Sequence, residues 1–125
     1  MNKIVVDSSA WIEYLKGSKK GERVRELISS AAIYTTVFIA AEVFAKYAKE
    51  NKNVQDAVIA LSTAALVSLN LEDAALTAQL YVSQRSLHEK FGMADAHVVA
   101  IAKKIGATIL TCDNDFKDIP EATVI

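Results

Sequence analysis

The sequence has almost no cysteine, no surplus of charge and no long apolar run, and each of these shortages excludes a class of protein. Its 125 residues include one cysteine, Cys112, so no disulfide can form within the chain and a disulfide-stapled secreted domain is excluded. No apolar run approaches the ~20 residues of a membrane-spanning helix. The apolar stretch before Asp7 is also too short for a signal peptide. We therefore expect a cytoplasmic protein.

The charge is nearly balanced, with 14 basic and 15 acidic residues and a net charge of −1. The chain therefore lacks the general field with which a basic domain attracts nucleic acid. Basic residues are nevertheless concentrated in two segments, as Lys16, Lys19, Lys20, Arg23 and Arg25 and as Lys46, Lys49 and Lys52. Two interpretations stay open for them: solvated helix faces, or a basic rim that guides a phosphate backbone.

Length and patterning predict one α/β domain spanning residues 1–125. The chain is 52% hydrophobic, which is enough for a real core, and short apolar runs alternate with helical periodicity. That alternation is typical of a parallel sheet with crossover helices. We expect strands at 4–6, 33–35, 66–69, 108–110 and 122–125. We expect helices from 8 to about 15, from after Gly21 to Ala31, and at 37–49, 54–61, 71–87 and 94–105. The two helices between 37 and 61 should form a protruding αα-hairpin.

Four carboxylates, Asp7, Glu42, Asp95 and Asp113, stand where a predicted strand ends or a predicted helix begins. Each alone has an ordinary explanation, as a helix cap, a surface residue, a first-turn acid or a turn former. All four, however, fall at the same predicted edge of the sheet, where the carboxyl ends of parallel strands meet. Like charges gathered there repel one another unless a hard divalent cation lies among them. The four acids therefore predict a metal site.

The helical register of Asp95 supports this prediction. Val98, Ala102 and Ile105 continue the same helix face at i+3, i+7 and i+10, so the carboxylate should point toward the core side. An aspartate is rarely buried without a partner. We therefore expect Asp95 at the rim of the sheet, facing polar groups or a cation.

Other kinds of site find little support in the sequence. Cys112 lacks the surroundings of a catalytic nucleophile, and a small core residue is the simpler interpretation. His88 and His97 have no zinc-site spacing, and His97 falls on roughly the opposite helix face from Asp95. A receiver-type signalling module also has a Mg²⁺-binding acidic edge on a parallel sheet. It remains a weaker alternative, because no second acid accompanies Asp7 and no predicted strand ends at Asp56.

Four segments of the chain resemble, in order and spacing, the motifs of PIN-domain ribonucleases of the VapC type, the toxins of VapBC toxin–antitoxin pairs. They are Asp7-Ser8-Ser9-Ala10-Trp11-Ile12, Ala41-Glu42-Val43, Gly92-Met93-Ala94-Asp95-Ala96 and Thr111-Cys112-Asp113-Asn114-Asp115-Phe116. The resemblance covers nearly the full length. It implies an α/β three-layer sandwich with a central parallel sheet of four to five short strands and about six to seven helices.

The same resemblance assigns roles to residues. Asp7, Glu42, Asp95 and Asp113 become the catalytic cluster that binds Mg²⁺, or Mn²⁺ in its place. Ser9 and Thr111 fall where the family has hydroxyls beside the metal, and Asp115 matches an accessory acid. The number of metal ions, and whether Asp115 is a direct ligand, stay open.

The implied activity is endonucleolytic hydrolysis of RNA that leaves 5′-phosphate and 3′-hydroxyl ends, with one or two cations activating water and stabilising charge on phosphorus. The implied partners are the RNA substrate, a cognate VapB-type antitoxin and a second copy of the chain in a homodimer. A stand-alone PIN nuclease that processes ribosomal or other RNA, or a PIN domain that has become an interaction module, remains an alternative. Nothing in the sequence indicates which RNA is cut.

Overall fold

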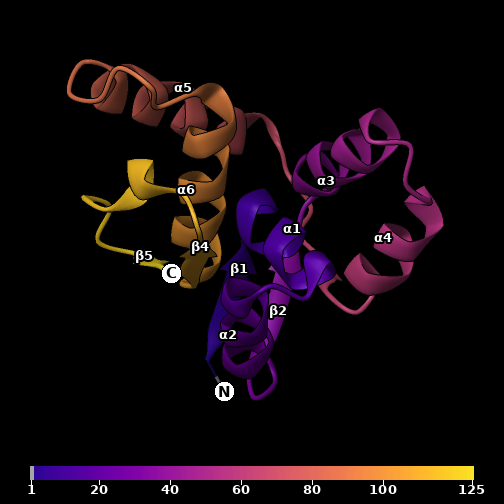
Figure 1. Ribbon diagram of the computed structural model, residues 1–125. Helices are drawn as coiled ribbons and strands as arrows, with labels where there is room; N and C mark the ends of the chain where they lie inside the picture. Colours follow the sequence, from indigo (N-terminus) through magenta and orange to yellow (C-terminus); the bar gives the residue numbers. More distant parts are fainter. Residues whose placement is uncertain (1) are drawn as a thin grey trace.

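A fully parallel sheet of five strands forms the centre of the computed structural model, which describes residues 2–125 (Figure 1). The strands are β1 (Lys3–Val6), β2 (Ala32–Thr35), β3 (Ala65–Leu66), β4 (Thr108–Thr111) and β5 (Ala122–Val124), in the order β3-β2-β1-β4-β5. Val5 and Val6 of the central strand are fully buried. Burial of consecutive residues is expected where both faces of a parallel sheet are covered.

Within residues 2–125, six α-helices and one short 3₁₀ helix connect the strands. They are α1 (Ser8–Lys16), α2 (Lys19–Ile28), α3 (Val37–Lys49), α4 (Val54–Leu61), α5 (Leu71–Arg85), α6 (Met93–Ile105) and the 3₁₀ helix η1 (Asn114–Phe116). Right-handed crossovers place α1 to α4 on one face of the sheet and α5 and α6 on the other, because the strand order reverses direction at β1. This confirms the predicted three-layer α/β sandwich.

The helices differ in how closely they cover the sheet. α1 contacts α2, α3 and β4, and α6 contacts β1 and β4, so these two helices cover the centre of the sheet. α3 and α4 pack against each other and project to one side in Figure 1, as the predicted αα-hairpin. α5 packs mainly on α6 and contains no buried residue. None of the helices within residues 2–125 is long and apolar enough to cross a membrane.

The strand expected at 66–69 was wrong in its bounds. The strand lies at the edge of the sheet, and its neighbour β2 ends at Thr35. The amide of Val67 donates to the Thr35 carbonyl at 2.9 Å, and β2 offers residues 68 and 69 no further partner. The sheet therefore stops at this point. Smaller shifts affect the predicted 71–87 and 94–105 helices, which run to Arg85 and from Met93.

The helix expected after Gly21 in fact begins before it. Ser18 caps α2 by accepting a hydrogen bond from the Gly21 amide at 3.0 Å, so Gly21 lies in the first turn. The helix ends at Ile28, before Ala31. A Cβ at Gly21 would lie 1.9 Å from the carbonyl oxygen of Glu13 in α1. The glycine is needed because the two helix backbones touch at this point.

The direction of the crossovers changes between β1 and β4. Chain connections leave β1 toward one face of the sheet and reach β4 from the other, which opens a crevice at the carboxyl ends of the two strands. Ligands of open parallel α/β sheets bind at such switch points. Asp7 directly follows β1, and Asp113 lies two residues beyond the end of β4.

Candidate active site

The four predicted carboxylates gather at the carboxyl edge of the sheet. Asp7 and Asp113 follow β1 and β4, Glu42 lies in the second turn of α3 after β2, and Asp95 lies in the first turn of α6. The Asp7 carboxylate acts electrostatically on both Glu42 and Asp95, and that of Asp113 acts on both Asp7 and Asp95. The structure therefore brings the four together, as their positions along the chain predict.

Asp7 is buried, with 5% of its surface exposed, and hydroxyl groups compensate for its lost hydration. Its Oδ2 accepts hydrogen bonds from Ser9 Oγ at 2.9 Å and Thr111 Oγ1 at 2.8 Å. The backbone amides of Cys112 and Asp113 donate to these two hydroxyl oxygens, each at 3.0 Å. Because each hydroxyl has one proton, accepting from an amide directs that proton to the carboxylate.

Asp7 occupies the N-cap position of α1 but does not act as its cap. Its backbone is extended, with φ of −67° and ψ of 155°, yet the side chain makes no capping hydrogen bond. The ordinary interpretation of this acid as a helix cap is therefore wrong. The carboxylate is directed toward the hydroxyls of Ser9 and Thr111 instead.

Burial and repulsion raise the pKa of three of the acids. Burial raises the pKa of Asp7, hydrogen bonds from Thr111 and Ser9 oppose it, and Asp113 adds to the rise. Burial also raises the pKa of Glu42, followed by repulsion from Asp7 and Asp95, against a hydrogen bond from the Ser8 side chain. In both cases burial is the larger cause, and the charges of neighbouring acids add to the rise.

Asp95 shows the same effect most clearly. Burial raises the pKa of Asp95 to about 6, a hydrogen bond from the Gly92 amide opposes the rise, and the charges of Asp113, Asp7 and Asp115 add to it. The Gly92 amide donates to Oδ2 at 2.8 Å, whereas Oδ1 receives no hydrogen bond from any donor in residues 2–125. One oxygen thus fixes the start of α6, and the other is free to accept a ligand.

The predicted face of α6 is confirmed. Val98 and Ala102 are buried and Ile105 is half-buried, on the helix face that carries Asp95. Asp95 itself is half-exposed, at the rim rather than inside the core. The helix thus anchors its carboxylate through apolar packing one and two turns away.

The two carboxylate oxygens of Asp113 also differ in their hydrogen bonding, as those of Asp95 do. Its Oδ1 accepts a hydrogen bond from the Asp115 amide at 2.9 Å and caps η1, which buries Phe116 completely. Oδ2 receives no hydrogen bond within the described part of the chain. Asp113 is therefore a turn former, as its ordinary explanation has it, and still offers an oxygen to a ligand. Asp115 is placed close by and contributes charge to the cluster.

The donor set suits a hard divalent cation, although no three acidic, histidine or cysteine side chains of residues 2–125 are arranged to hold one ion together. Mg²⁺ usually keeps several waters and binds through one or two carboxylates together with substrate phosphate, so a ready-made cage is not required. A cation would also remove the repulsion that raises the pKa values of Asp7, Glu42 and Asp95. The residues therefore fit Mg²⁺ or Mn²⁺.

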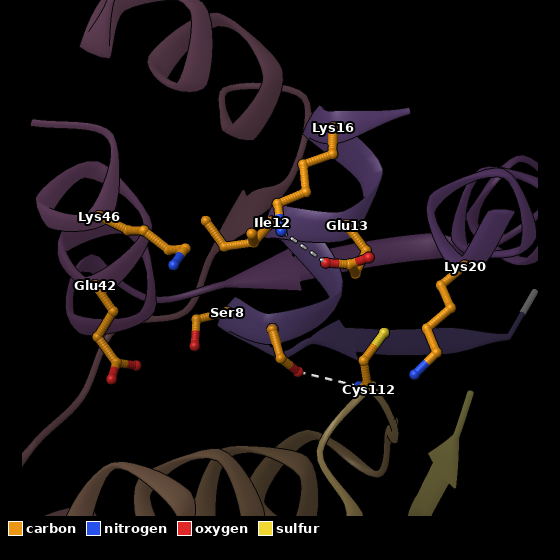
Figure 2. Close-up of a pocket in the computed structure, with 9 residues that line it drawn as sticks. Ser8, Ile12, Glu13, Lys16, Lys20, Glu42, Lys46 and Cys112 are labelled. Atoms are coloured by element: carbon orange, nitrogen blue, oxygen red, sulfur yellow. Dashed lines mark hydrogen bonds and ion pairs between the residues drawn. The ribbon is translucent and has the colours of Figure 1, made fainter. Parts of the chain in front are cut away.

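A cavity of about 570 Å³ has one of the four carboxylates, Glu42, in its lining, and Figure 2 shows the side chains around it. It is lined by Ser8, Ser9, Ile12, Glu13, Lys16, Lys20, Glu42, Lys46 and Cys112. The lysines and arginines of the two basic segments therefore have different surroundings, and their role as a basic rim for a phosphate backbone stays a prediction. Three of their lysines face the cavity, while others, such as Arg23 paired with Glu26 at 3.0 Å, lie on solvated helix faces.

The residues set aside as ligands or nucleophiles have other surroundings. His97 Nε2 is hydrogen-bonded to Thr36 Oγ1 at 2.7 Å, and the ring meets Phe38 edge-on. His88 lies 3.6 Å from Asp118. Burial raises the pKa of the Cys112 thiol, which keeps it protonated and a poor nucleophile. Cys112 is half-buried and packs against the core, but it also lines the cavity.

Sequence reasoning missed two residues that position the acids. Ser8, at the start of α1, lines the cavity together with Glu42 and lowers its pKa, and the Gly92 amide holds Asp95 by donating to Oδ2. Gly92 could have been found, because it lies three residues before Asp95, the spacing of a reciprocal helix cap. Ser8 had no such signal, since its contact with α3 depends on the packing of two helices.

Comparison with known proteins identifies the family. The sequence matches the family model described as PIN domain over residues 4–122. The chain belongs to the PIN-domain family. That membership rules out the receiver-type alternative. A sequence search of curated proteins found no match.

Solved structures share the PIN fold over nearly the whole chain. VapBC2 from Rickettsia felis bound to a promoter DNA fragment has 18% identity and a TM-score of 0.77, covering 98% of this chain and 97% of that one. A toxin-antitoxin complex from Klebsiella pneumoniae has 20% identity and a TM-score of 0.74, covering 97% and 96%. VapC20 from Mycobacterium tuberculosis, described as a sarcin-ricin loop cleaving toxin, has 20% identity and a TM-score of 0.71, covering 94% and 95%.

We expect Asp95→Asn to stabilise this PIN domain at neutral pH when metal is absent. The pKa of Asp95 is about 6 in the folded state, against an ordinary 3.8, so the folded state binds more protons between these values. The stabilisation that comes from protonating Asp95 in the folded state is therefore fully present below about pH 4, and it is lost as the pH rises through about 6. Because Asp95 is only half-buried, solvent screening limits the gain to roughly 1 kcal/mol, or a few degrees in Tm.

Asp56→Asn is the matched control, since Asp56 is also the third residue of its helix but is exposed on α4. Thermal unfolding should be followed by circular dichroism in EDTA at about pH 4.5 and about pH 7.5. The gain should occur only for Asp95→Asn and only at the higher pH. A lower Tm for Asp95→Asn under those conditions would show that the carboxylates do not destabilise the metal-free fold.

Proposed function

We propose that this PIN domain, spanning the whole chain, is a divalent-metal-dependent endoribonuclease and the VapC-type toxin of a VapBC toxin–antitoxin pair. The observation that carries the proposal is the meeting of four carboxylates, three with raised pKa values, at the switch-point crevice of the sheet. The similarity to VapBC complexes and to a toxin described as cleaving the sarcin-ricin loop supports it.

Each residue of the site has a distinct role in this proposal. Asp7, Glu42, Asp95 and Asp113 are the catalytic and metal-binding acids. When bound there, Mg²⁺ or Mn²⁺ supplies charge that stabilises the phosphorane-like transition state and lowers the pKa of water. Ser9 and Thr111 favour the ionised form of Asp7 and align its carboxylate through their hydroxyl protons. Asp115 fixes Asp113 through its backbone amide.

The proposed reaction is hydrolysis in which the oxygen of a water molecule attacks phosphorus and the bond to the 3′-oxygen breaks. The products are a 5′-phosphate and a 3′-hydroxyl. No covalent intermediate with the protein is needed. Burial raises the pKa of Cys112, which disfavours the thiolate that such an intermediate would require.

The activity can be tested with metal-free protein supplied with Mg²⁺ or Mn²⁺ and total cellular RNA. We expect endonucleolytic cleavage that EDTA abolishes, with fragments that a 5′-phosphate-dependent exonuclease degrades. Asp95→Asn should reduce the rate by at least about a hundredfold, because one electrostatic contact to the transition state contributes that much. Asp56→Asn should cleave like the wild type. Equal cleavage by Asp95→Asn and wild type would refute the site.

The proposed inhibitor is a VapB-type antitoxin whose apolar tail lies in a groove and places an arginine against the carboxylates, where it replaces the cation. The cluster suits such a guanidinium for the reason it suits a metal: its charges are uncompensated. A tail peptide from the neighbouring antitoxin gene should inhibit cleavage, and its Arg→Gln version should inhibit at least about tenfold less. Undiminished cleavage at saturating antitoxin would contradict this mechanism.

The proposed homodimer would use the apolar surface formed by the start of α3, β3 and the start of α5. Val37 and Leu66 line two adjoining grooves on this surface. Phe38 and Leu69 line one of these two grooves and also a third. Val37 and Leu66 are 74% and 65% exposed. Exposed apolar surface of this extent is typical of a protein interface.

Val37→Asp tests the homodimer. Val37 is the first residue of α3, where an acid favours the helix, so the substitution should disturb the interface and not the fold. By light scattering the wild type should have twice the chain mass of 13.6 kDa, and Val37→Asp should have the single mass. Ile59→Asp is the control, because Ile59 is 67% exposed on α4 outside these grooves. A monomeric wild type, or an unaffected Val37→Asp, would exclude this dimer.

A further inference from the structure

The three lysines around the cavity beside the carboxylates differ in how their charges are compensated. Lys16 pairs with Glu13 at 3.3 Å and Lys46 with Glu50 at 3.4 Å. Lys20 makes neither an ion pair nor a side-chain hydrogen bond with any residue from 2 to 125. It is therefore the lysine of the cavity whose charge is most available to a ligand.

The position of Lys20 is fixed by its neighbours in α2. The Ser18 hydroxyl accepts from the Gly21 amide at 3.0 Å and donates to Glu13 Oε1 at 2.9 Å. Gly21 lies directly against the backbone of Glu13. These contacts hold the first turn of α2 on α1, so the base of the Lys20 side chain cannot move away from the cavity.

The Lys20 ammonium faces the cavity from the side opposite Lys46. Figure 2 shows both side chains extending inward, Lys20 toward Cys112 and Lys46 toward Glu42. The charge of Lys20 acts on both Cys112 and Glu13, which confirms that it lies near them. A strand of polyanion that passes the carboxylates through this cavity would therefore meet a cation on either side.

A cation beside the carboxylates would favour the binding of RNA. A divalent ion among the carboxylates offsets the charge of the phosphate being cleaved, but the neighbouring phosphates still approach an acidic edge of a protein with a net charge of −1. A lysine that contacts a phosphate also releases condensed counterions, which favours binding. Lys20 lines the same cavity as Glu42 and has no ion-pair partner within residues 2–125, so its charge is available to one of these neighbouring phosphates.

We propose that Lys20 is a substrate-positioning residue, whose ammonium binds the RNA backbone phosphate adjacent to the scissile one in the cavity between α1, α2 and α3. This inference rests on the proposed ribonuclease function and adds the direction in which the RNA strand leaves the carboxylates. Lys46 closes the opposite side of the cavity and contributes less, because it shares its charge with Glu50.

The test compares Lys20→Gln with Lys19→Gln, each combined with Asp95→Asn so that RNA is bound and not cut. Lys19 and Lys20 are the first two residues of α2 and both are exposed, but only Lys20 lines the cavity. Binding of a fluorescent single-stranded RNA is measured by anisotropy in Mg²⁺ between about 50 and 200 mM salt. Lys20→Gln should weaken binding roughly fivefold and reduce the slope of log K against log salt by about 0.7.

The two controls should leave binding intact. Lys19→Gln should keep the wild-type slope, and Lys20→Arg should restore it. In the cleaving protein, Lys20→Gln should raise KM by roughly the same factor, with kcat within about twofold. These readouts separate a phosphate contact from a structural effect, which would change kcat and the melting temperature instead.

The outcomes also separate this inference from the function on which it rests. If the wild type cleaves RNA but Lys20→Gln and Lys19→Gln show the same slope and KM, Lys20 contacts no phosphate and the inference is wrong. If the wild type neither binds nor cleaves RNA, the proposed function fails together with it. If Lys20→Gln alters only inhibition by the antitoxin, the cavity receives that protein and not the RNA backbone.

Discussion

The burial of like charges at the carboxyl edge of the sheet is the constraint on which the site depends. Asp7 is the centre of the cluster, because it is the most buried of the four and the hydroxyls that donate to it oppose the rise of its pKa. Those hydroxyls are oriented by amides that follow β4, so the bonds that stabilise the Asp7 charge also join the ends of β1 and β4. Fold and charge state are therefore coupled at this point.

The positions of the acids could be predicted because strand ends and helix starts are local features of a sequence. The parallel order of the strands then brings those positions together, and the register of Asp95 followed from the spacing of Val98 and Ala102. The end of β3 and the start of α2 could not be predicted in this way. The first depends on where a neighbouring strand stops, and the second on the contact of Gly21 with the α1 backbone.

A hydrogen bond between α3 and α6 helps to place Glu42 and Asp95 relative to each other. Thr36 caps α3, which carries Glu42, and its hydroxyl is bonded to His97 of α6, which carries Asp95. The sequence held no sign that this histidine links the two helices. Contacts between side chains far apart in the chain depend on packing that single-sequence periodicity does not contain.

The two oxygens of one carboxylate can serve different purposes, and this explains why Asp95 and Asp113, considered alone, resemble ordinary structural residues. Asp95 uses one oxygen to fix the first turn of α6, and Asp113 uses one to cap η1. These bonds hold each side chain in a single orientation, so the second oxygen points to a fixed place before any ligand arrives. Preorganisation of this kind lowers the entropy cost of binding a cation. The structural roles of the acids are thus the means by which a site of like charges is kept in place.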